Sequence, residues 1–399
     1  MNDLAQQLVG TKAAFFDFVT HFGGAQRSTV ELAARLAKLM DILVWDAYGS
    51  SCDYIQAAQN SNLNVDVLFP SARHQSIGSA GQPFRRALKF GRSVPEQFAL
   101  IRSIRHRIVQ DAPDIVWTNS RKGFVALAAS APRHLPLVYF LRGGEGAVPS
   151  PSFVRQLLRR RASRVFVLSD SIGQLLVSRG YPARRISVVP NAVEVSEVTA
   201  RAQLPLEAPL PQSSKPLRLL MAATLVPNKG QLQAVRVLHR LASLGEDPVL
   251  FLAGDVPAGG DHRYPRRIVE LAATLGVDDR VEFLGWRSDV LALIRNASAV
   301  LVLSESEGVP RVILEAMAIG VPVVATPVGG VRDLVCDGVT GWVVPADDIG
   351  AIAQAIINAT HGHVSGILEA AKTDVSARFS PERQLENAAR AFAAAMMRL

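Results

Sequence analysis

Residues 304–326 read SESEGVPRVILEAMAIGVPVVAT, and they are the most informative part of the chain. An apolar run ends just before them, and an almost wholly apolar helical stretch follows the turn ESEG. Pro310 suits the first turn of a helix, where its missing N–H has no partner to lose. Gly320 and Pro322 then end the helix before another short apolar run. The stretch therefore predicts one strand–helix–strand unit of a parallel sheet.

Two acids stand out in this apolar setting. Glu307 lies at the mouth of the expected helix and Glu315 in its middle, eight residues apart. At helical rise they would be ~12 Å apart along the axis. Carboxylates accept hydrogen bonds from paired sugar hydroxyls, and the free N–H groups of a helix start favour phosphate. The alternative is an i,i+4 surface pair between Arg311 and Glu315, and spacing alone does not choose between the two.

Strand and helix signals alternate along the whole chain. The strand candidates are 13–19, 114–120, 136–142 and 164–169 in the first half, and 217–224, 248–255, 280–286, 299–304 and 322–326 in the second. Such alternation is typical of parallel strands joined by crossover helices. We therefore expect the α/β class, with two doubly wound Rossmann-like domains at 1–198 and 217–378 and a proline-rich linker at 199–216.

Composition narrows the class of protein. A chain of 399 residues with 49% hydrophobic and 20% charged residues suits two globular domains. No apolar run approaches the ~18 residues that span a bilayer, and the polar start MNDLAQQLVG does not look like a leader. Cys52 and Cys336 provide neither a disulfide framework nor a metal-binding spacing. We expect a cytoplasmic protein.

Positive charge is concentrated in the first half. Residues 1–200 hold 24 Lys and Arg against 14 Asp and Glu, or +10, whereas residues 201–399 hold 19 against 21, or −2. The basic clusters are at 85–92, 102–107 and 154–164. A basic face attracts anionic membranes or phosphorylated substrates, or only keeps the protein soluble. No zinc-finger or aromatic-interleaved pattern supports a nucleic-acid partner.

The ordered series of motifs resembles the retaining family 4 glycosyltransferases, also called glycosyl transferases group 1, which have the GT-B fold. Residues 304–345 carry their paired glutamates with seven residues between them. The other similar segments are HFGGAQRSTVELAARL (21–36), APDIVWTNS (112–120), ISVVPNAVE (186–194), TLVPNKGQLQAV (224–235) and RFSPERQLENAARAF (378–392). The resemblance covers nearly the whole chain. It implies an acceptor-binding first domain that faces a nucleotide-sugar-binding second domain across a cleft, with residues 379–399 returning to the first domain as a helix.

The resemblance also implies roles for residues. Lys229 would neutralise the donor diphosphate, Glu307 would face the transferred sugar, and both would serve catalysis; Glu315 would bind the ribose hydroxyls. The other donor-binding candidates are Gly24, Thr224, Trp286, Gly308, Val309 and Pro310. The acceptor-side candidates are Gly23, Asn119, Arg121 and Arg142. The chain contains no Asp-x-Asp motif, so we expect no metal and no cofactor beside the UDP- or GDP-sugar substrate.

Two departures from the family pattern concern charge. Many relatives have Gly-Arg where this chain has Ala223 and Thr224, and Arg27 or Arg311 could replace that arginine. Relatives also often place a histidine in the strand that contains Thr118 or in the one that contains Phe140, and this chain has none in either.

The expected function is retaining transfer of a hexosyl unit from a nucleotide-diphosphate sugar to a lipid-linked or polysaccharide acceptor in cell-surface glycan biosynthesis. The basic first domain fits peripheral contact with the anionic inner face of a membrane. Two alternatives stay open: an isomerase similar to nucleotide-sugar 2-epimerases, and a non-catalytic nucleotide-sugar-binding protein.

Overall fold

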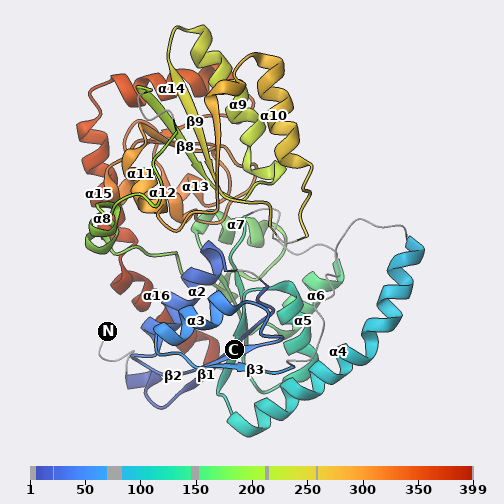
Figure 1. The fold of residues 1–399 in the computed structure, drawn as a ribbon. Coiled ribbons are helices and arrows are strands. Elements are labelled where there is room, and N and C mark those ends of the chain that lie inside the picture. The colour runs from blue at the N-terminus through green and yellow to red at the C-terminus, as the bar shows by residue number, and fades with distance from the viewer. Residues whose placement is uncertain are drawn as a thin grey trace.

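The chain forms two parallel sheets with helices on both faces, one above the other in Figure 1. This is the expected α/β GT-B architecture of two Rossmann-like domains. The structure is a computed structural model that describes residues 6–20, 22–69, 83–144, 152–211, 215–257 and 259–397.

The N-terminal sheet has seven strands in the order β3-β2-β1-β4-β5-β6-β7. They are β1 (Lys12–Asp17), β2 (Asp41–Asp46), β3 (Val65–Val67), β4 (Ile115–Thr118), β5 (Leu137–Leu141), β6 (Arg164–Val167) and β7 (Ile186–Val188). Its helices are α2 (Gly24–Leu36), α3 (Cys52–Asn60), α4 (Pro83–Asp111), α5 (Arg121–Ser130), α6 (Ser152–Arg161) and α7 (Asp170–Ser178). The order reverses direction between β1 and β4, which is the switch point where doubly wound sheets bind ligands.

The C-terminal sheet has six strands in the order β10-β9-β8-β11-β12-β13. They are β8 (Leu217–Ala222), β9 (Pro248–Ala253), β10 (Val281–Gly285), β11 (Ala299–Val302), β12 (Val323–Ala325) and β13 (Trp342–Val343). The helices of this half are α8 (Val195–Ala202), α9 (Gln231–Ser243), α10 (Tyr264–Leu275), α11 (Val290–Asn296), α12 (Arg311–Ile319), α13 (Val331–Leu334), α14 (Ile349–His361) and α15 (Ser365–Arg378). Its switch point lies between β8 and β11.

Burial explains the apolar strand sequences. Every residue of β5 (LVYFL) and of β9 (PVLFLA) is buried, as expected of central strands whose two faces are both covered by helices. Because the strands run parallel, their carboxyl ends meet at one edge of each sheet. The loops that leave those edges carry the residues of interest.

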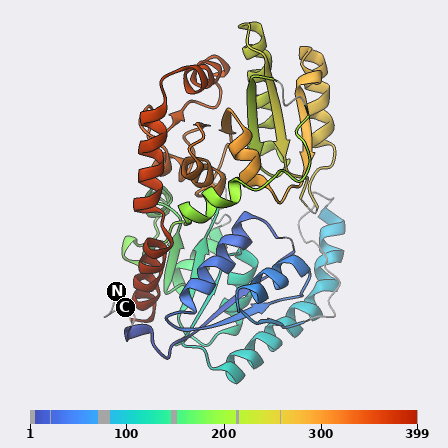
Figure 2. The same ribbon diagram turned by 60° about the vertical axis from the view of Figure 1, so that its left-hand side comes forward.

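The chain crosses between the two halves twice, and the crossings lie side by side. It leaves the first half through residues 189–194 and returns just before α16 (Pro381–Met396), where Val193 N–H donates to the Phe379 carbonyl at 3.0 Å. Helix α16 packs on α2 and β7 of the N-terminal half, whereas α15 packs on α12. Helices α15 and α16, in red, run along one side of the molecule in Figure 2.

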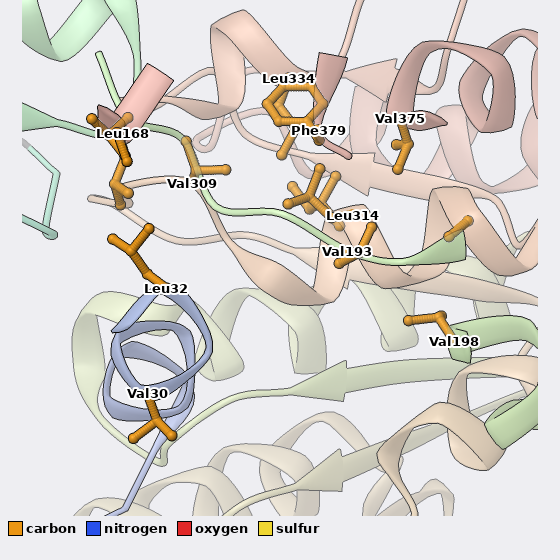
Figure 3. Close-up of a cluster of buried hydrophobic side chains, with 14 of the residues drawn as sticks. Val30, Leu32, Leu168, Val193, Val198, Val309, Leu314, Leu334, Val375 and Phe379 are labelled. Carbon is orange, nitrogen blue, oxygen red and sulfur yellow. The ribbon is translucent and has the colours of Figure 1, made fainter. Parts of the chain in front are cut away.

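One buried apolar cluster joins the two halves (Figure 3). It includes Leu32 of α2 and Leu168 after β6, and on the other side Val309 and Leu314 of the α12 segment. Burial of such side chains contributes roughly 1.5–3 kcal/mol each, so packing holds the halves together in addition to the two connections.

The domain boundary differs from the expected one. Residues 195–202 form α8, which packs on α11, α12 and α15, and Val198 is buried in the shared cluster. The boundary expected at 198 therefore falls inside a helix of the second half. Of the segment expected as a linker, 199–216, residues 199–202 belong to α8, and the described residues 203–211 and 215–216 contain neither helix nor strand.

The long helix α4 lies on the outside of the N-terminal half, in cyan in Figure 1. It exposes Phe98 and Val109 to solvent. The side chains of the basic stretch 85–92 lie outside the described residues. Over the part of the chain that the structure describes, no helix combines the length and apolar character needed to cross a bilayer.

Candidate functional site

The carboxyl ends of neighbouring strands β8 and β11 bring Lys229 and Glu307 together. Lys229 ends a short 3-10 turn after β8, and Glu307 lies in the loop from β11 to α12. Lys229 Nζ is 2.5 Å from Glu307 Oε1, which also accepts a hydrogen bond from Ser304 Oγ at 2.7 Å. The two charged side chains are 22% and 13% exposed, so the pair is largely shielded from water.

Glycine at position 230 makes this approach possible. Gly230 has φ +79°, and a Cβ there would lie 2.1 Å from the Leu303 carbonyl oxygen. Only glycine tolerates both conditions at low cost. The sequence PNKG therefore lets the Lys229 loop lie directly against the end of β11.

Helix α12 begins one residue later than the sequence indicated. Pro310 is its N-cap, with extended ψ of 123°, and Arg311 is the first helical residue. Only the step from Arg311 to Glu315 is therefore helical. The expected spacing of ~12 Å between Glu307 and Glu315 assumed a helix throughout, so that derivation is wrong.

Arg311 links the two halves at the start of α12. Its Nη1 donates to Glu31 Oε2 at 2.7 Å and to Ser28 Oγ at 3.2 Å, both on α2, and its Nε donates to Glu315 Oε1 at 3.3 Å. The i,i+4 pair with Glu315 thus exists, but it is buried rather than on the surface. Although burial opposes the charge of Arg311, the Glu31 and Glu315 carboxylates hold its pKa above the ordinary value.

The N-terminal half meets the Glu307 loop backbone to backbone. A Cβ on Gly144, which follows β5, would lie 2.2 Å from the Glu307 carbonyl oxygen. A Cβ on Gly308 would lie 2.4 Å from the Arg142 carbonyl oxygen. Contacts below 3.0 Å require a shift, so both positions need glycine for the halves to come this close.

Two donor-binding candidates lie elsewhere along the same edge of the C-terminal sheet. Trp286 follows β10, is 62% exposed, and its backbone N–H donates to Asp255 Oδ2 at 3.1 Å. Thr224 follows β8 and is exposed, and its carbonyl accepts from Gln231 Nε2 at 2.9 Å. The strand order therefore places Trp286, Thr224 and then the Glu307 loop in a row.

The acceptor-side candidates follow β1, β4 and β5 of the N-terminal sheet. Gly23 is the N-cap of α2. The adjacent donor-binding candidate, Gly24, faces Arg311, whose Cδ would lie 3.9 Å from an added Cβ. Asn119 Nδ2 donates to Thr29 Oγ1 of α2 at 2.6 Å. The remaining two candidates are placed differently: Arg121 is exposed at the start of α5, and Arg142 stacks on Phe140.

Two family models match the chain. Glycosyltransferase Family 4 matches residues 22–197, which carry the N-terminal sheet except for β1, and Glycosyl transferases group 1 matches residues 206–371, which carry the C-terminal sheet. The chain belongs to the glycosyl transferases group 1. The predicted family membership is thereby confirmed.

One curated relative of the chain is WcaL of Salmonella typhimurium, whose name describes it as a putative glycosyltransferase of colanic acid biosynthesis. It is 28% identical over 238 residues, which are 57% of this chain and 55% of that protein. A D-inositol 3-phosphate glycosyltransferase of Mycobacterium sp. (strain JLS) is 34% identical over 218 residues, 53% of this chain and 48% of that protein. The chain thus spans about half the length of the curated relatives it matches.

Solved structures extend the likeness over the whole fold. HepE of Anabaena, in complex with UDP and glucose, has a TM-score of 0.75 at 24% identity, and the match covers 96% of this chain and 99% of that one. At this identity the likeness establishes the shared GT-B fold.

Two buried acids were missed in the sequence. Asp17 ends β1 and Asp46 ends β2, and they are 8% and 0% exposed. Burial raises the pKa of Asp17 to about 6, against a hydrogen bond from Ser120, and burial also raises the pKa of Asp46. The available signal was an aspartate closing each of two apolar runs, KAAFFD and DILVWD, at the edge where ligands bind.

Among the residues that the structure describes, no cluster of three or more His, Cys, Asp and Glu side chains could hold a metal ion.

Proposed function

We propose that the protein transfers a hexosyl unit from a nucleotide-diphosphate sugar to a glycan or lipid-linked acceptor, with retention, in cell-surface glycan biosynthesis. One observation carries the proposal: Lys229 and Glu307 converge at the switch point of the C-terminal sheet, directly against the N-terminal half. A cation, a carboxylate and the start of a nine-residue helix meet there, as binding of a sugar diphosphate needs.

The roles follow from charge. The Lys229 ammonium neutralises the diphosphate, and the N–H groups of Gly308 and Val309 approach it beside the N-cap proline of α12. Glu307 faces the sugar, and Glu315, shared with Arg311, accepts from the ribose hydroxyls. The bond from the sugar C1 to the phosphate oxygen breaks on the side where the acceptor hydroxyl attacks, and the leaving phosphate takes the hydroxyl proton. Lys229 and the helix start stabilise the leaving charge, so the proposal needs no metal.

Relatives support the substrate class. The structure of HepE holds UDP and glucose, which supports a UDP-sugar donor, and WcaL is named for the synthesis of a polysaccharide, colanic acid. Peripheral contact with anionic lipid is part of the proposal because Arg155, Arg159 and Arg160 of α6 are exposed in the basic half.

Incubation with UDP-, GDP- and ADP-sugars labelled in the sugar tests the proposal. Transfer to an added acceptor, or slow hydrolysis of one donor, is the expected result. Conversion of the sugar with the nucleotide still attached would identify an isomerase. Saturable binding with no turnover would identify a binding protein and end the transferase proposal.

A further inference from the structure

The neighbouring strands β4 and β5 are each followed by buried side-chain atoms that have no hydrogen-bond partner among the described residues. Strands β4 and β5 are parallel neighbours, with Thr118 opposite Tyr139, so Asn119 and Arg142 leave the same sheet edge. Asn119 Oδ1 is buried, and so are Nε and Nη2 of Arg142. Within the described residues none of the three has a hydrogen-bond partner.

The Arg142 side chain is nevertheless held in place. Its guanidinium carbon lies 4.2 Å from the centre of the Phe140 ring, and Nη1 donates to Asn191 Oδ1 at 3.1 Å. Asn191 in turn donates to the Val309 carbonyl at 2.7 Å. Stacking and one hydrogen bond thus orient the guanidinium and leave one edge, Nε with Nη2, without a partner. Through that edge an arginine donates two parallel hydrogen bonds to a carboxylate.

Two of the nearby carboxylates pair with other cations, and the charge of a third, Asp17, favours the protonated form of Arg142 without an ion pair. Glu307 pairs with Lys229 at 2.5 Å, and Glu31 pairs with Arg311 at 2.7 Å. No ion pair joins Arg142 to any carboxylate among the described residues. Burial, and next the charge of Arg311, lower the pKa of Arg142 to about 9. A buried cation with no counter-ion is costly, and a ligand that brings an anion removes that cost.

Arg142 lies next to the part of the proposed donor site that would hold the sugar. Its carbonyl oxygen touches the Gly308 backbone, and Gly144, two residues later, touches the Glu307 backbone. The Arg142 guanidinium is linked through Asn191 to the Val309 carbonyl. Asn119 Nδ2 donates to Thr29, next to Ser28, which holds Arg311, so both side chains lie on the side of the N-terminal half that faces the Glu307–Glu315 segment.

We propose that Arg142 and Asn119 recognise a carboxylated sugar, a hexuronosyl unit. Its carboxylate accepts hydrogen bonds from Nε and Nη2 of Arg142, and one of its hydroxyls donates to Asn119 Oδ1. The inference rests on the proposed function and narrows its substrate class. The carboxylate enters on the donor sugar or on the terminal sugar of the acceptor, and the chemistry of recognition is the same in both cases.

Calorimetric titration with matched sugars tests the inference. The donor arm compares UDP-glucuronate with UDP-glucose, or GDP-mannuronate with GDP-mannose if GDP binds better than UDP. The acceptor arm compares methyl glucuronide with methyl glucoside in the presence of the nucleoside diphosphate. The wild type should prefer the carboxylated sugar at least tenfold in one arm, and Arg142→Gln should remove that preference while binding of UDP alone stays the same. Arg142→Lys should restore only part of it, and Arg240→Gln, an exposed arginine in the last turn of α9, should behave as wild type.

Equal affinity for charged and neutral sugars in both arms would overturn the inference, and wild-type protein suffices for this result if Arg142→Gln does not fold. Loss of UDP binding in folded Arg142→Gln would also overturn it, because Arg142 would then contact the diphosphate. If no nucleotide binds, the proposed function fails separately. Saturable, Arg142-dependent binding of methyl glucuronide would still support the carboxylate site, and its absence would refute that site as well.

Discussion

Lys229 Nζ and Glu307 Oε1 lie 2.5 Å apart, so the cation proposed to hold the diphosphate is neutralised by the acid proposed to face the sugar. Ser304 Oγ steadies the same carboxylate oxygen. A donor that enters this site must bring its phosphate oxygens to the ammonium and displace the carboxylate. The ion pair thus keeps two partly buried charges neutralised until the ligand replaces one partner.

Substitutions in this pair should have opposite effects on UDP binding. Lys229→Ala removes a charge-assisted bond of about 1.5–3 kcal/mol, so the dissociation constant of UDP should rise roughly tenfold or more. Glu307→Gln frees the ammonium, so UDP should bind equally or more tightly while sugar transfer falls. Isothermal titration measures both constants. Lys215→Ala, which breaks a partly exposed ion pair with Asp247, is the control. Unchanged UDP affinity in Lys229→Ala would refute the role of the ammonium.

Removal of the Glu315 charge should weaken nucleoside binding specifically. Glu315→Gln should raise the dissociation constant of UDP roughly tenfold, because a carboxylate accepts ribose hydroxyls more strongly than an amide does. Binding of pyrophosphate, which has no ribose, should not change. Glu31→Gln, which removes the other carboxylate on Arg311, is the matched control. If pyrophosphate and UDP weaken together, Glu315 acts through Arg311 and the helix start instead.

Gly144→Ala should reduce turnover by keeping the two halves apart. The added methyl would lie 2.2 Å from the Glu307 carbonyl oxygen, which is backbone and cannot rotate away. A shift of about 1 Å in the catalytic geometry can cost roughly 100-fold in rate. Gly366→Ala meets nothing within 4 Å and lies in α15, so it should keep the wild-type rate and gain about 0.5–1 kcal/mol of stability. Steady-state rates measure the effect on turnover, and urea melts measure the effect on stability. A normal turnover rate in Gly144→Ala would contradict the close approach of Gly144 to the Glu307 backbone.

Asp17→Asn should stabilise the protein near neutral pH. Burial raises the pKa of Asp17 to about 6 from an ordinary 3.8, so the folded state holds this proton more tightly than the unfolded chain. The wild type therefore loses stability as the pH rises from about 4 to about 6. A shift of two units corresponds to about 2–3 kcal/mol. The variant should gain up to that amount at pH 7 and little at pH 4 in urea melts. Asp41→Asn, exposed at the start of β2, is the control, and a gain independent of pH would exclude this explanation.

Neutralisation of the exposed arginines of α6 should weaken binding to anionic vesicles. Arg155, Arg159 and Arg160 changed to Ser remove three positive charges, each worth about 1 kcal/mol near such a surface. Arg161 is not a suitable target, because its guanidinium donates to the Ala131 and Pro132 carbonyls and supports the end of α5.

Sedimentation with phosphatidylserine vesicles at low salt measures the effect. A triple serine variant of Arg236, Arg240 and Arg263, exposed arginines of the other half, removes the same charge and should sediment as wild type. Equal loss in both triple variants would indicate a general charge effect and not a membrane-binding face.

Sequence reasoning found the two sheets because burial imposes local patterns. The apolar runs of β5 and β9 and the Gly320 stop of α12, with φ +86°, are readable from neighbouring residues alone. Strand β2 was missed because its apolar run is short and carries an aspartate at each end. Helix α8 was missed because its partners lie about 90 residues or more further along the chain.

The sequence alone determined the class of fold, the family and the loops that carry Lys229, Glu307 and Glu315, since these depend on short-range pattern and motif order. Only the tertiary structure decided which groups meet: that Lys229 pairs with Glu307, that Arg311 crosses to Glu31, and that one edge of Arg142 has no partner among the described residues. The reason is physical, because charge pairing and desolvation depend on distances of a few ångströms between atoms that are far apart along the chain.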